Sequence, residues 1–255
     1  MDIQILVATH KKYWMPNDSI YLPIQVGAAT CNDDFGYIRD NLGENISLKN
    51  ANFCELTAIY WAWKNLKADY IGLCHYRRYF SKSSLFIDVK NNRENLIMTR
   101  NNYEEILEKN DIILPKKRNY YIETVESQYG HAHNSDDLRV VGKVIQDLCP
   151  EYYESYICHL KKHKTHILNM FVMKNIYFQQ YCKWLFAILF EVEKNVDISD
   201  RDVYQQRIFG FLSERLLDVW IEKNKLHYSE VDIIELEPVN WIRKISSFIG
   251  RKIKG

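Results

Sequence analysis

The sequence lacks the features that mark several classes of protein. Its 34 basic and 33 acidic residues leave a formal net charge of +1, so no bulk positive charge is present to hold a nucleic acid. No stretch reaches the roughly 18 apolar residues that span a bilayer, and the nearest approach, residues 181–192, contains Lys183 and Glu191. The N-terminus has no basic segment followed by an apolar one, so no leader peptide is predicted.

The spacing of the cysteines and the absence of common catalytic motifs exclude further kinds of site. The six cysteines, at positions 31, 54, 74, 149, 158 and 182, form no Cys-x-x-Cys pair. Scattered cysteines are typical of free thiols in a reducing compartment, so we expect a cytoplasmic protein. The sequence contains no GxGxxG, GxxxxGK[ST], HExxH or GxSxG motif, which leaves no sign of these nucleotide, metal or serine-nucleophile sites.

What the sequence does contain is enough apolar surface for one substantial core. Of its 255 residues, 47% are hydrophobic and 14% are aromatic, with 18 Tyr and 6 Trp. This composition excludes disorder over most of the chain and predicts one globular domain. Aromatic side chains that are not needed for packing can stack on flat or ring-shaped ligands.

Three short apolar runs are predicted to be buried strands of a parallel sheet: residues 3–9, 69–75 and 111–115. Basic residues follow each of them. In open α/β sheets, ligands bind outside the carboxyl ends of the strands, so these residues are candidates for a binding site. They are His10, Lys11, Lys12, His75, Arg77, Arg78, Lys116, Lys117 and Arg118.

The remaining elements are predicted to be mainly helical. Residues 13–50 are rich in Gly, Pro, Asn and Asp, which predicts a long irregular segment. A largely buried helix is expected over residues 53–66, and further helices near 136–148, 150–162, 175–194 and 202–224, with a short strand at 169–173.

Arg77 and Arg78 are the strongest candidates for phosphate binding. Guanidinium groups donate paired hydrogen bonds to phosphate oxygens, and the adjacent His75, Tyr76 and Tyr79 could contact a base or a sugar. A nucleoside diphosphate fits this chemistry. The alternative is that both arginines form ion pairs with carboxylates elsewhere in the fold.

Two further clusters could carry chemistry. His131 and His133 could bind a metal if they shared one face, or could hydrogen-bond a substrate. Asp200, Asp202 and Glu214 are candidates for a general base that deprotonates an acceptor hydroxyl, and Arg207 lies two helical turns from Glu214 on the same face. Asp200 and Asp202 could instead cap the helix that follows them.

The last residues, 239–255, differ in composition from the rest. They contain five basic residues and no acidic one. Apolar residues recur at helical spacing, which is typical of a helix lying on an anionic membrane surface; the alternative is a terminal helix packed on the body of the protein. The apolar residues are Trp241, Ile242, Ile245, Phe248, Ile249 and Ile253.

Several runs of residues, in order along the chain, resemble the DUF4422 family. They are His10–Tyr13, Asp40–Ser47, Cys54–Lys64, Gly72–Tyr79 and Arg207–Arg215. The resemblance covers roughly residues 3–230. The family is found among bacterial capsule, exopolysaccharide and O-antigen proteins, and some members are assigned as hexosyl- or galactofuranosyltransferases.

The resemblance implies a GT-A-like α/β fold, with a mainly parallel mixed sheet flanked by helices and a C-terminal helical portion. It implies one transferase domain over residues 1–238, followed by the basic tail at 239–255. The expected partners are a UDP-hexose, a lipid-linked glycan acceptor and, through the tail, the inner face of the cell membrane. No nucleic-acid partner is expected.

In the GT-A architecture a strand delivers Asp-x-Asp to hold a divalent ion on the diphosphate. Here the strand expected to correspond delivers His75-Tyr76-Arg77-Arg78, so we expect fixed cations to replace the ion; Mn²⁺ or Mg²⁺ is the alternative. Thr9, His10 and Lys11 are expected to border the nucleotide, with Tyr76 or Tyr79 stacking on the ligand.

The expected reaction is direct, inverting displacement of UDP by an acceptor hydroxyl. Two alternatives stay open: a non-catalytic sugar-binding or scaffold subunit, and a sugar-phosphate transferase.

Overall fold

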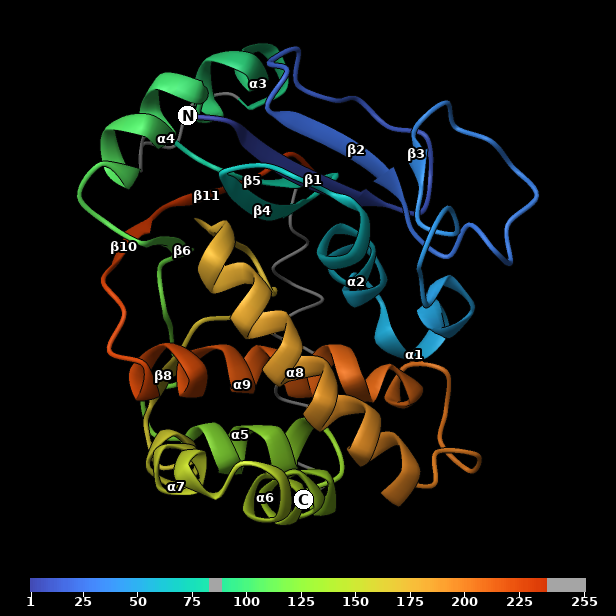
Figure 1. The fold of residues 1–255 in the computed structure, drawn as a ribbon, viewed down its shortest axis with the longest axis vertical. Coiled ribbons are helices and arrows are strands. Elements are labelled where there is room, and N and C mark those ends of the chain that lie inside the picture. The colour runs from blue at the N-terminus through green and yellow to red at the C-terminus, as the bar shows by residue number, and fades with distance from the viewer. Residues whose placement is uncertain (83–88, 238–255) are drawn as a thin grey trace.

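A computed structural model describes residues 1–82 and 89–237 of the protein. Its centre is a twisted, mainly parallel sheet that helices cover on both faces (Figure 1). This is the mainly parallel α/β architecture that the sequence predicts. The predicted basic tail, residues 239–255, lies outside the described residues.

Within the described residues the main sheet has nine strands, in the order β10-β6-β9-β4-β1-β2-β3, with β5 joined to β4 and to β11. The β9 strand runs antiparallel to its neighbours β4 and β6, while β1 pairs in parallel with β2 and β4. The strands are β1 Ile3–Thr9, β2 Tyr21–Gln25, β3 Ile38–Arg39, β4 Tyr70–His75, β5 Arg78–Phe80, β6 Ile112–Pro115, β9 Phe171–Lys174, β10 Tyr228–Val231 and β11 Ile233–Glu235. A separate small sheet pairs β7 Arg118–Asn119 with β8 Lys164–Thr165.

The helices form two layers around the sheet (Figure 1). Helices α2 and α8 pack against one face, with α9 and then α5, α6 and α7 beyond them, and α4 covers the other face. The helices are α1 Asn50–Phe53, α2 Leu56–Asn65, α3 Val89–Leu96, α4 Arg100–Leu107, α5 Val125–Ala132, α6 Asp136–Leu148, α7 Tyr153–Leu160, α8 Asn175–Asn195 and α9 Ile208–Lys223, with 3₁₀ turns η1 Ser47–Lys49, η2 Pro150–Tyr152 and η3 Gln205–Arg207.

Alternation along β1 explains why the sheet is covered on both faces. Leu6 and Ala8 belong to the core under α2 and α8, whereas Ile5 and Val7 belong to the core under α4. Successive side chains of a strand point to opposite faces, so a strand that is apolar at every position needs a layer on each side.

Glycine at position 72 allows β4 and β9 to lie against each other. A Cβ atom there would lie 2.8 Å from the carbonyl oxygen of Phe171 and 2.7 Å from the Val172 side chain. Backbone cannot give way as a flexible side chain can, so we expect any larger residue to push the strands apart.

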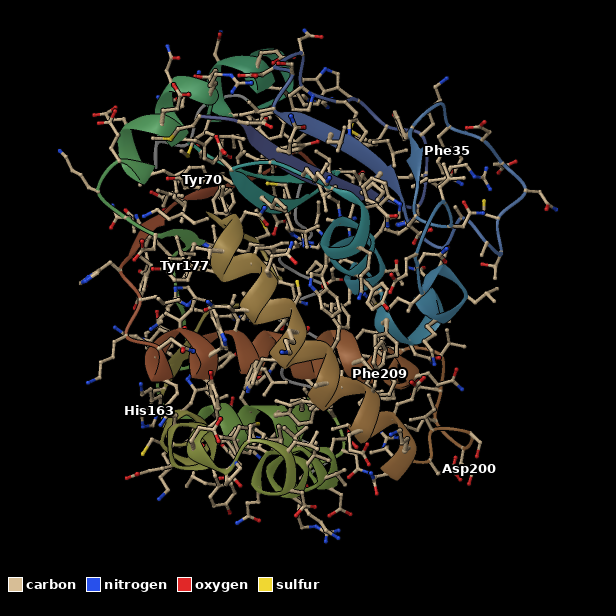
Figure 2. The ribbon with its side chains drawn as sticks, viewed as in Figure 1. Phe35, Tyr70, His163, Tyr177, Asp200 and Phe209 are labelled. Atoms are coloured by element: carbon tan, nitrogen blue, oxygen red, sulfur yellow. The ribbon has the colours of Figure 1, made fainter. Side chains whose placement is uncertain are left out.

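Aromatic stacking fixes the beginning of α9 against α1. The rings of Phe53 and Phe209 are stacked with centroids 4.3 Å apart, and both side chains are buried. Figure 2 labels Phe209 on α9. This contact between the rings places the segment that contains Arg207 and Glu214 next to α1, the first α-helix after β3.

Several predicted elements agree with the structure, and others need correction. The strand at residues 3–9 and the helix at 136–148 have the predicted bounds. The helix predicted over 53–66 is broken at Cys54, whose φ is 52°. The segment 13–50 contains β2 and β3, and the chain returns to the sheet after α9 through β10 and β11, which the sequence analysis did not predict. In the described part of the chain, no helix is long and apolar enough to cross a membrane.

Candidate functional site

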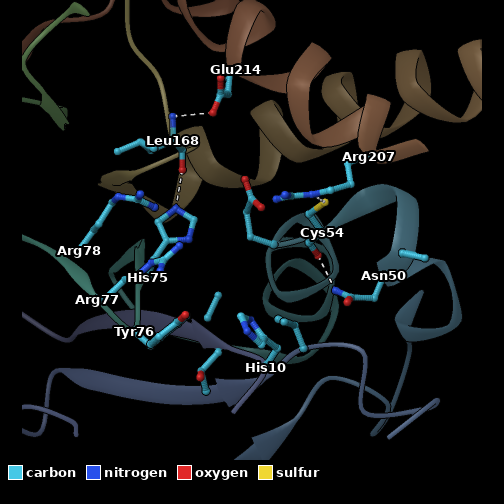
Figure 3. A pocket seen from close by; sticks show the side chains of 15 residues that line it. His10, Asn50, Cys54, His75, Tyr76, Arg77, Arg78, Leu168, Arg207 and Glu214 are labelled. Carbon is cyan, nitrogen blue, oxygen red and sulfur yellow. Dashed lines mark hydrogen bonds between the residues drawn. The ribbon is translucent and has the colours of Figure 1, made fainter. Parts of the chain in front are cut away.

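A cavity of about 430 Å³ opens at the carboxyl ends of β1 and β4 (Figure 3). Segments from β1, the α1–α2 junction, the turn after β4, the residues before β9 and α9 all contribute to its wall. The lining residues are Ala8, Thr9, His10, Val26, Asn50, Ala51, Cys54, Glu55, His75, Tyr76, Arg77, Arg78, Leu168, Arg207 and Glu214.

Parallel pairing of β1 with β4 brings two of the predicted basic loops together. Ala8 lies opposite His75 in the register, so the residues after each strand emerge at the same edge of the sheet. Thr9 is buried and its hydroxyl donates to the carbonyl oxygen of Lys11 at 2.5 Å, which fixes the turn. Lys11 lies just outside the lining, with its ammonium group 5.0 Å from the centre of the Tyr76 ring.

His75 is held in one orientation by the backbone. Its Nε2 lies 2.7 Å from the carbonyl oxygen of Leu168; because a carbonyl only accepts, Nε2 carries the proton. Burial lowers the pKa of His75, while the nearby Glu55 carboxylate opposes that shift. The neutral ring therefore presents Nδ1 as an acceptor.

Arg77 and Arg78 line the cavity, and each also forms an ion pair with the C-terminal end of the described chain. Arg77 donates to Glu237 at 2.9 Å, and Arg78 donates to Glu235 at 3.2 Å. The antiparallel pairing of β11 with β5 places Glu235 opposite Arg78, and Glu237 follows two residues later in the chain. Ion pairing, which the sequence left open as the alternative to phosphate binding, is present, although both guanidinium groups remain at the cavity wall.

Arg207 is in a different situation, because its neighbour is a thiol. Its Nε donates to the sulfur of Cys54 at 3.2 Å, and burial together with Glu55 raises the pKa of Cys54 to about 11. The thiol is therefore neutral at physiological pH. Among the described residues no carboxylate forms an ion pair with Arg207, so its charge is available at the cavity.

The positive charge of this wall affects the pKa of His10. Burial lowers the pKa of His10, and Lys11, Arg77 and Arg207 lower it further by repelling a proton. Fixed positive charge with a low-dielectric wall concentrates anions. The cavity can therefore bind an anionic ligand such as a phosphate or diphosphate.

Two carboxylates also line the cavity, one of which the sequence analysis did not select. Glu214, on α9, accepts from the backbone N–H of Leu168 at 2.8 Å and from Arg215 at 2.7 Å. Burial raises the pKa of Glu214, and Arg215 opposes that shift. Glu55, between α1 and α2, accepts from Asn169 at 2.7 Å. The sequence feature that could have identified Glu55 is its position directly before a buried apolar helix.

Besides Lys11, three of the predicted substrate-binding residues lie outside the lining. Tyr79 is fully buried, with its ring against Trp14 and Tyr21, so it cannot stack on a ligand. His131 is exposed and pairs with Glu123. His133 stacks on Phe211 with centroids 4.0 Å apart and contacts the side chain of Gln205.

Asp200 and Asp202 also lie away from the cavity, in the exposed segment after α8 (Figure 2). Asp202 accepts from the backbone N–H of Gln205 at 2.9 Å, at the start of η3. Asp202 therefore satisfies the first backbone N–H of η3, the kind of role that the sequence left open for it. Of the predicted bases, the structure brings only Glu214 to the cavity.

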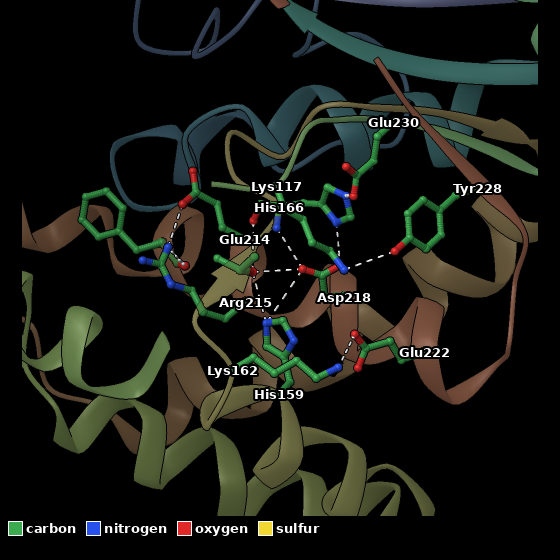
Figure 4. A network of polar contacts seen from close by, with 12 residues as sticks. Lys117, His159, Lys162, His166, Glu214, Arg215, Asp218, Glu222, Tyr228 and Glu230 are labelled. Atoms are coloured by element: carbon green, nitrogen blue, oxygen red, sulfur yellow. Dashed lines mark hydrogen bonds and ion pairs between the residues drawn. The ribbon is translucent and has the colours of Figure 1, made fainter. Parts of the chain in front are cut away.

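Lys117, which follows β6, belongs to a second polar cluster (Figure 4). Lys116 pairs with Asp232 at 2.8 Å, and Lys117 lies 3.8 Å from the buried Asp218. Asp218 also accepts from Nδ1 of His166 at 2.5 Å. These cations are neutralised there and do not reach the cavity, which corrects the expectation that all three strands supply one site.

Three of the four carboxylate oxygens that line the cavity already accept hydrogen bonds from the protein. Both oxygens of Glu214 already accept hydrogen bonds, and one oxygen of Glu55 is bonded to Asn169. Across residues 1–82 and 89–237, no three His, Cys, Asp or Glu side chains are grouped so that they could hold a metal ion. Mg²⁺ and Mn²⁺ prefer carboxylate and carbonyl oxygens over guanidinium surroundings.

The structure is similar to a solved structure, the bifunctional glycosyltransferase WbbM in its apo form, with a TM-score of 0.87 and 28% sequence identity. The similarity covers 93% of this chain and 46% of the WbbM chain, so this chain spans about half the length of that protein. The architecture is GT-A-like. None of the curated proteins matches the sequence. Residues 4–225 match the family described as a domain of unknown function, DUF4422, and the chain therefore belongs to the DUF4422 family.

Proposed function

We propose that this protein is a glycosyltransferase that transfers a hexosyl residue from a UDP-sugar to a glycan acceptor. The observation that carries the proposal is a cationic cavity at the carboxyl edge of the sheet, lined by Arg77, Arg78 and Arg207. The likeness to a glycosyltransferase of GT-A-like architecture supports the same reaction class. A cavity of about 430 Å³ falls in the range of small-molecule sites.

The proposed chemistry is stabilisation of a departing diphosphate by fixed cations. When the bond between the sugar and the diphosphate breaks, negative charge develops on the phosphate oxygens. Preorganised donors aimed at that charge lower the barrier, and guanidinium groups match phosphate geometry through paired hydrogen bonds. Because most carboxylate oxygens of the lining are already bonded within the protein, we propose a mechanism with no step through a metal.

The finer assignments are part of the same proposal. Thr9, His10 and Lys11 border the nucleotide, and Tyr76 is the stacking residue, since Tyr79 is buried beneath other rings. The donor is a UDP-hexose, with UDP-galactofuranose among the donors to compare. The acceptor is a lipid-linked or oligosaccharide glycan of a cell-surface polysaccharide, and displacement is direct and inverting.

The test uses Arg77→Ala and Arg207→Ala, with Arg139→Ala as the control because Arg139 forms an exposed pair with Asp136 on α6. Donors to be screened are UDP-galactofuranose, UDP-galactose, UDP-glucose and UDP-N-acetylglucosamine. We expect each cavity variant to lower kcat by about 10²- to 10³-fold, as loss of one transition-state donor does elsewhere. Thermal melting and UDP affinity separate lost chemistry from lost folding.

Full activity in Arg77→Ala and Arg207→Ala would contradict the diphosphate role. EDTA is expected to leave the wild-type rate unchanged; strong inhibition that Mn²⁺ reverses would contradict the metal-free mechanism.

A second candidate is a non-catalytic sugar-binding subunit of a polysaccharide assembly. The ion pairs of Arg77 and Arg78 with Glu237 and Glu235 favour it, because they give both arginines a structural role. Slow hydrolysis of a UDP-sugar by the purified protein would exclude this candidate, while binding without turnover of any donor would support it.

A further inference from the structure

The cavity contains a carboxylate that the proposed reaction needs. An inverting transfer requires a base within hydrogen-bond reach of the acceptor hydroxyl. Glu55 and Glu214 are the carboxylates among the described lining residues, and their surroundings differ in a way that decides between them.

Glu214 is already used to hold the backbone. One of its oxygens accepts from the N–H of Leu168, and the other accepts from the guanidinium of Arg215. Its side chain is 18% exposed and that of Arg215 is 5% exposed. A carboxylate paired with a buried cation on one side and with backbone on the other is a structural anchor, and neither of its oxygens is left for an acceptor hydroxyl.

Glu55 has one oxygen fixed and one oxygen without a protein partner. Its Oε1 accepts from Asn169 at 2.7 Å, and no hydrogen bond within the described chain involves Oε2. Asn169 is buried and is itself fixed, because it accepts from Ser213 at 2.8 Å and donates to the carbonyl oxygen of Gly210. The carboxylate is therefore held in a set orientation with one oxygen left for a ligand.

The backbone around this pair is strained on both sides. Cys54, directly before Glu55, has φ 52°, and Leu168 and Asn169 have φ 76° and 52°. Non-glycine residues in the left-handed region each cost energy and persist where the surrounding structure enforces them, commonly at functional sites. Here the strained residues are those that aim Glu55 and its amide partner.

Glu55 also lies among the groups that would flank a sugar donor. It interacts electrostatically with His75, whose pKa burial lowers and Glu55 partly restores, and it lies next to Cys54, the partner of Arg207. This places a carboxylate beside the proposed diphosphate cations, and none of them forms an ion pair with Glu55 in the described structure.

We infer that Glu55 is the general base of the transfer, a step that rests on the proposed glycosyltransferase function. Its Oε2 takes the proton of the acceptor hydroxyl while the oxygen of that hydroxyl forms a bond to the anomeric carbon. The bond from that carbon to the diphosphate oxygen breaks, and its electron pair leaves with UDP, whose charge Arg77, Arg78 and Arg207 stabilise. Protonated Glu55 then returns its proton to water.

The test compares Glu55→Gln with Glu214→Gln in the full-length protein. Glutamine at position 55 keeps an oxygen that accepts from Asn169 and removes the basic group. We expect kcat to fall about 10²- to 10⁴-fold, the usual contribution of a general base. UDP affinity and the KM for donor should change by less than about threefold, a difference below 1 kcal/mol.

Glu214→Gln is the matched control on the other carboxylate. It should lower the melting temperature by loosening Leu168 and Arg215, and it should retain more kcat than Glu55→Gln. Glu55→Asp keeps the carboxylate at shorter reach, so it should show an intermediate kcat with unchanged UDP affinity; it also decides the matter if Glu55→Gln does not fold.

Wild-type kcat in Glu55→Gln or in Glu55→Asp would overturn the inference. A larger loss of kcat in folded Glu214→Gln than in Glu55→Gln would also overturn it and assign the base to Glu214. If the wild-type protein transfers no sugar from any donor to any acceptor, the proposed function fails before the role of Glu55 is reached, so the two failures are distinguishable.

Discussion

At the scale of single residues, the proposed donor site is already occupied by the protein's own carboxylates. Glu237 lies 2.9 Å from Arg77 and 3.6 Å from Lys11, and the hydrogen bond from Arg77 holds the pKa of Glu237 below its ordinary value. Glu237 is therefore ionised at neutral pH. A diphosphate that binds to Arg77 must displace this carboxylate or share the guanidinium with it.

Glu237→Gln should therefore tighten UDP binding. Exposed ion pairs contribute up to about 1 kcal/mol, so we expect affinity to rise about two- to fivefold at low salt, with a smaller gain at high salt. Isothermal titration calorimetry measures the change, and Glu193→Gln, which removes the partner of Lys49, is the control. Weaker UDP binding in Glu237→Gln would mean that the carboxylate positions Arg77 for phosphate.

At the scale of elements, the sequence was informative where a local pattern sets the structure. The run Ile3–Thr9 is apolar at nearly every position, and the structure has a buried parallel strand with those bounds. The strands β3 and β11 have two and three residues, too few for a periodic pattern. The same limit applies to the site, because the pairing of Glu235 with Arg78 joins residues far apart in sequence.

The position of Glu55 shows a second limit. A continuous apolar helix was the natural interpretation of residues 53–66, and in such a helix Glu55 would lie in the first turn. The left-handed backbone at Cys54 instead ends α1 and begins α2. Sequence pattern does not reveal that break, since the preference of cysteine is against it.

The segment that carries Leu168 and Asn169 is fixed to α9 by Asp218. This buried carboxylate accepts from Thr165 at 3.0 Å and from the backbone and the ring of His166. Burial would raise the pKa of Asp218, but His166, His159 and Lys117 hold it well below its usual range. The chain that leads into the cavity is thereby locked to the helix that supplies Glu214 (Figure 4).

Asp218→Asn is expected to destabilise the fold by about 3 kcal/mol at neutral pH, because it leaves buried cationic and imidazole groups without their anion. A carboxylate whose pKa is lower in the folded state contributes stability above its unfolded value, near pH 4, and loses it as the pH falls further. Urea unfolding at pH 7 and below pH 4 should therefore show a difference that shrinks on acidification. Asp136→Asn, on the exposed face of α6, should show little difference at either pH.

At the scale of the whole molecule, the described chain ends beside the cavity, at Glu237. Glu237 contacts Arg77 and is followed directly by residues 238–255. By composition this segment is the part of the sequence most suited to a membrane surface. We propose that binding through this segment brings the protein to the membrane surface where a lipid-linked acceptor is found.

Deletion of residues 240–255 tests this arrangement. The segment contains Arg243, Lys244, Arg251, Lys252 and Lys254, and each basic residue near an anionic surface contributes about 1 kcal/mol. We expect the full chain to sediment with vesicles that contain an anionic lipid and not with neutral vesicles, with binding that weakens as salt rises. The deleted protein should stay in the supernatant, and replacing the five basic residues by Gln should have the same effect while keeping the apolar ones.

Because this segment contains none of the residues of the proposed catalytic machinery, the deleted protein should keep its rate toward a water-soluble acceptor and lose rate only toward one in vesicles. Sedimentation that is unchanged by the deletion would show that the tail is not a membrane anchor, and the basic residues would then need a role on the body of the protein.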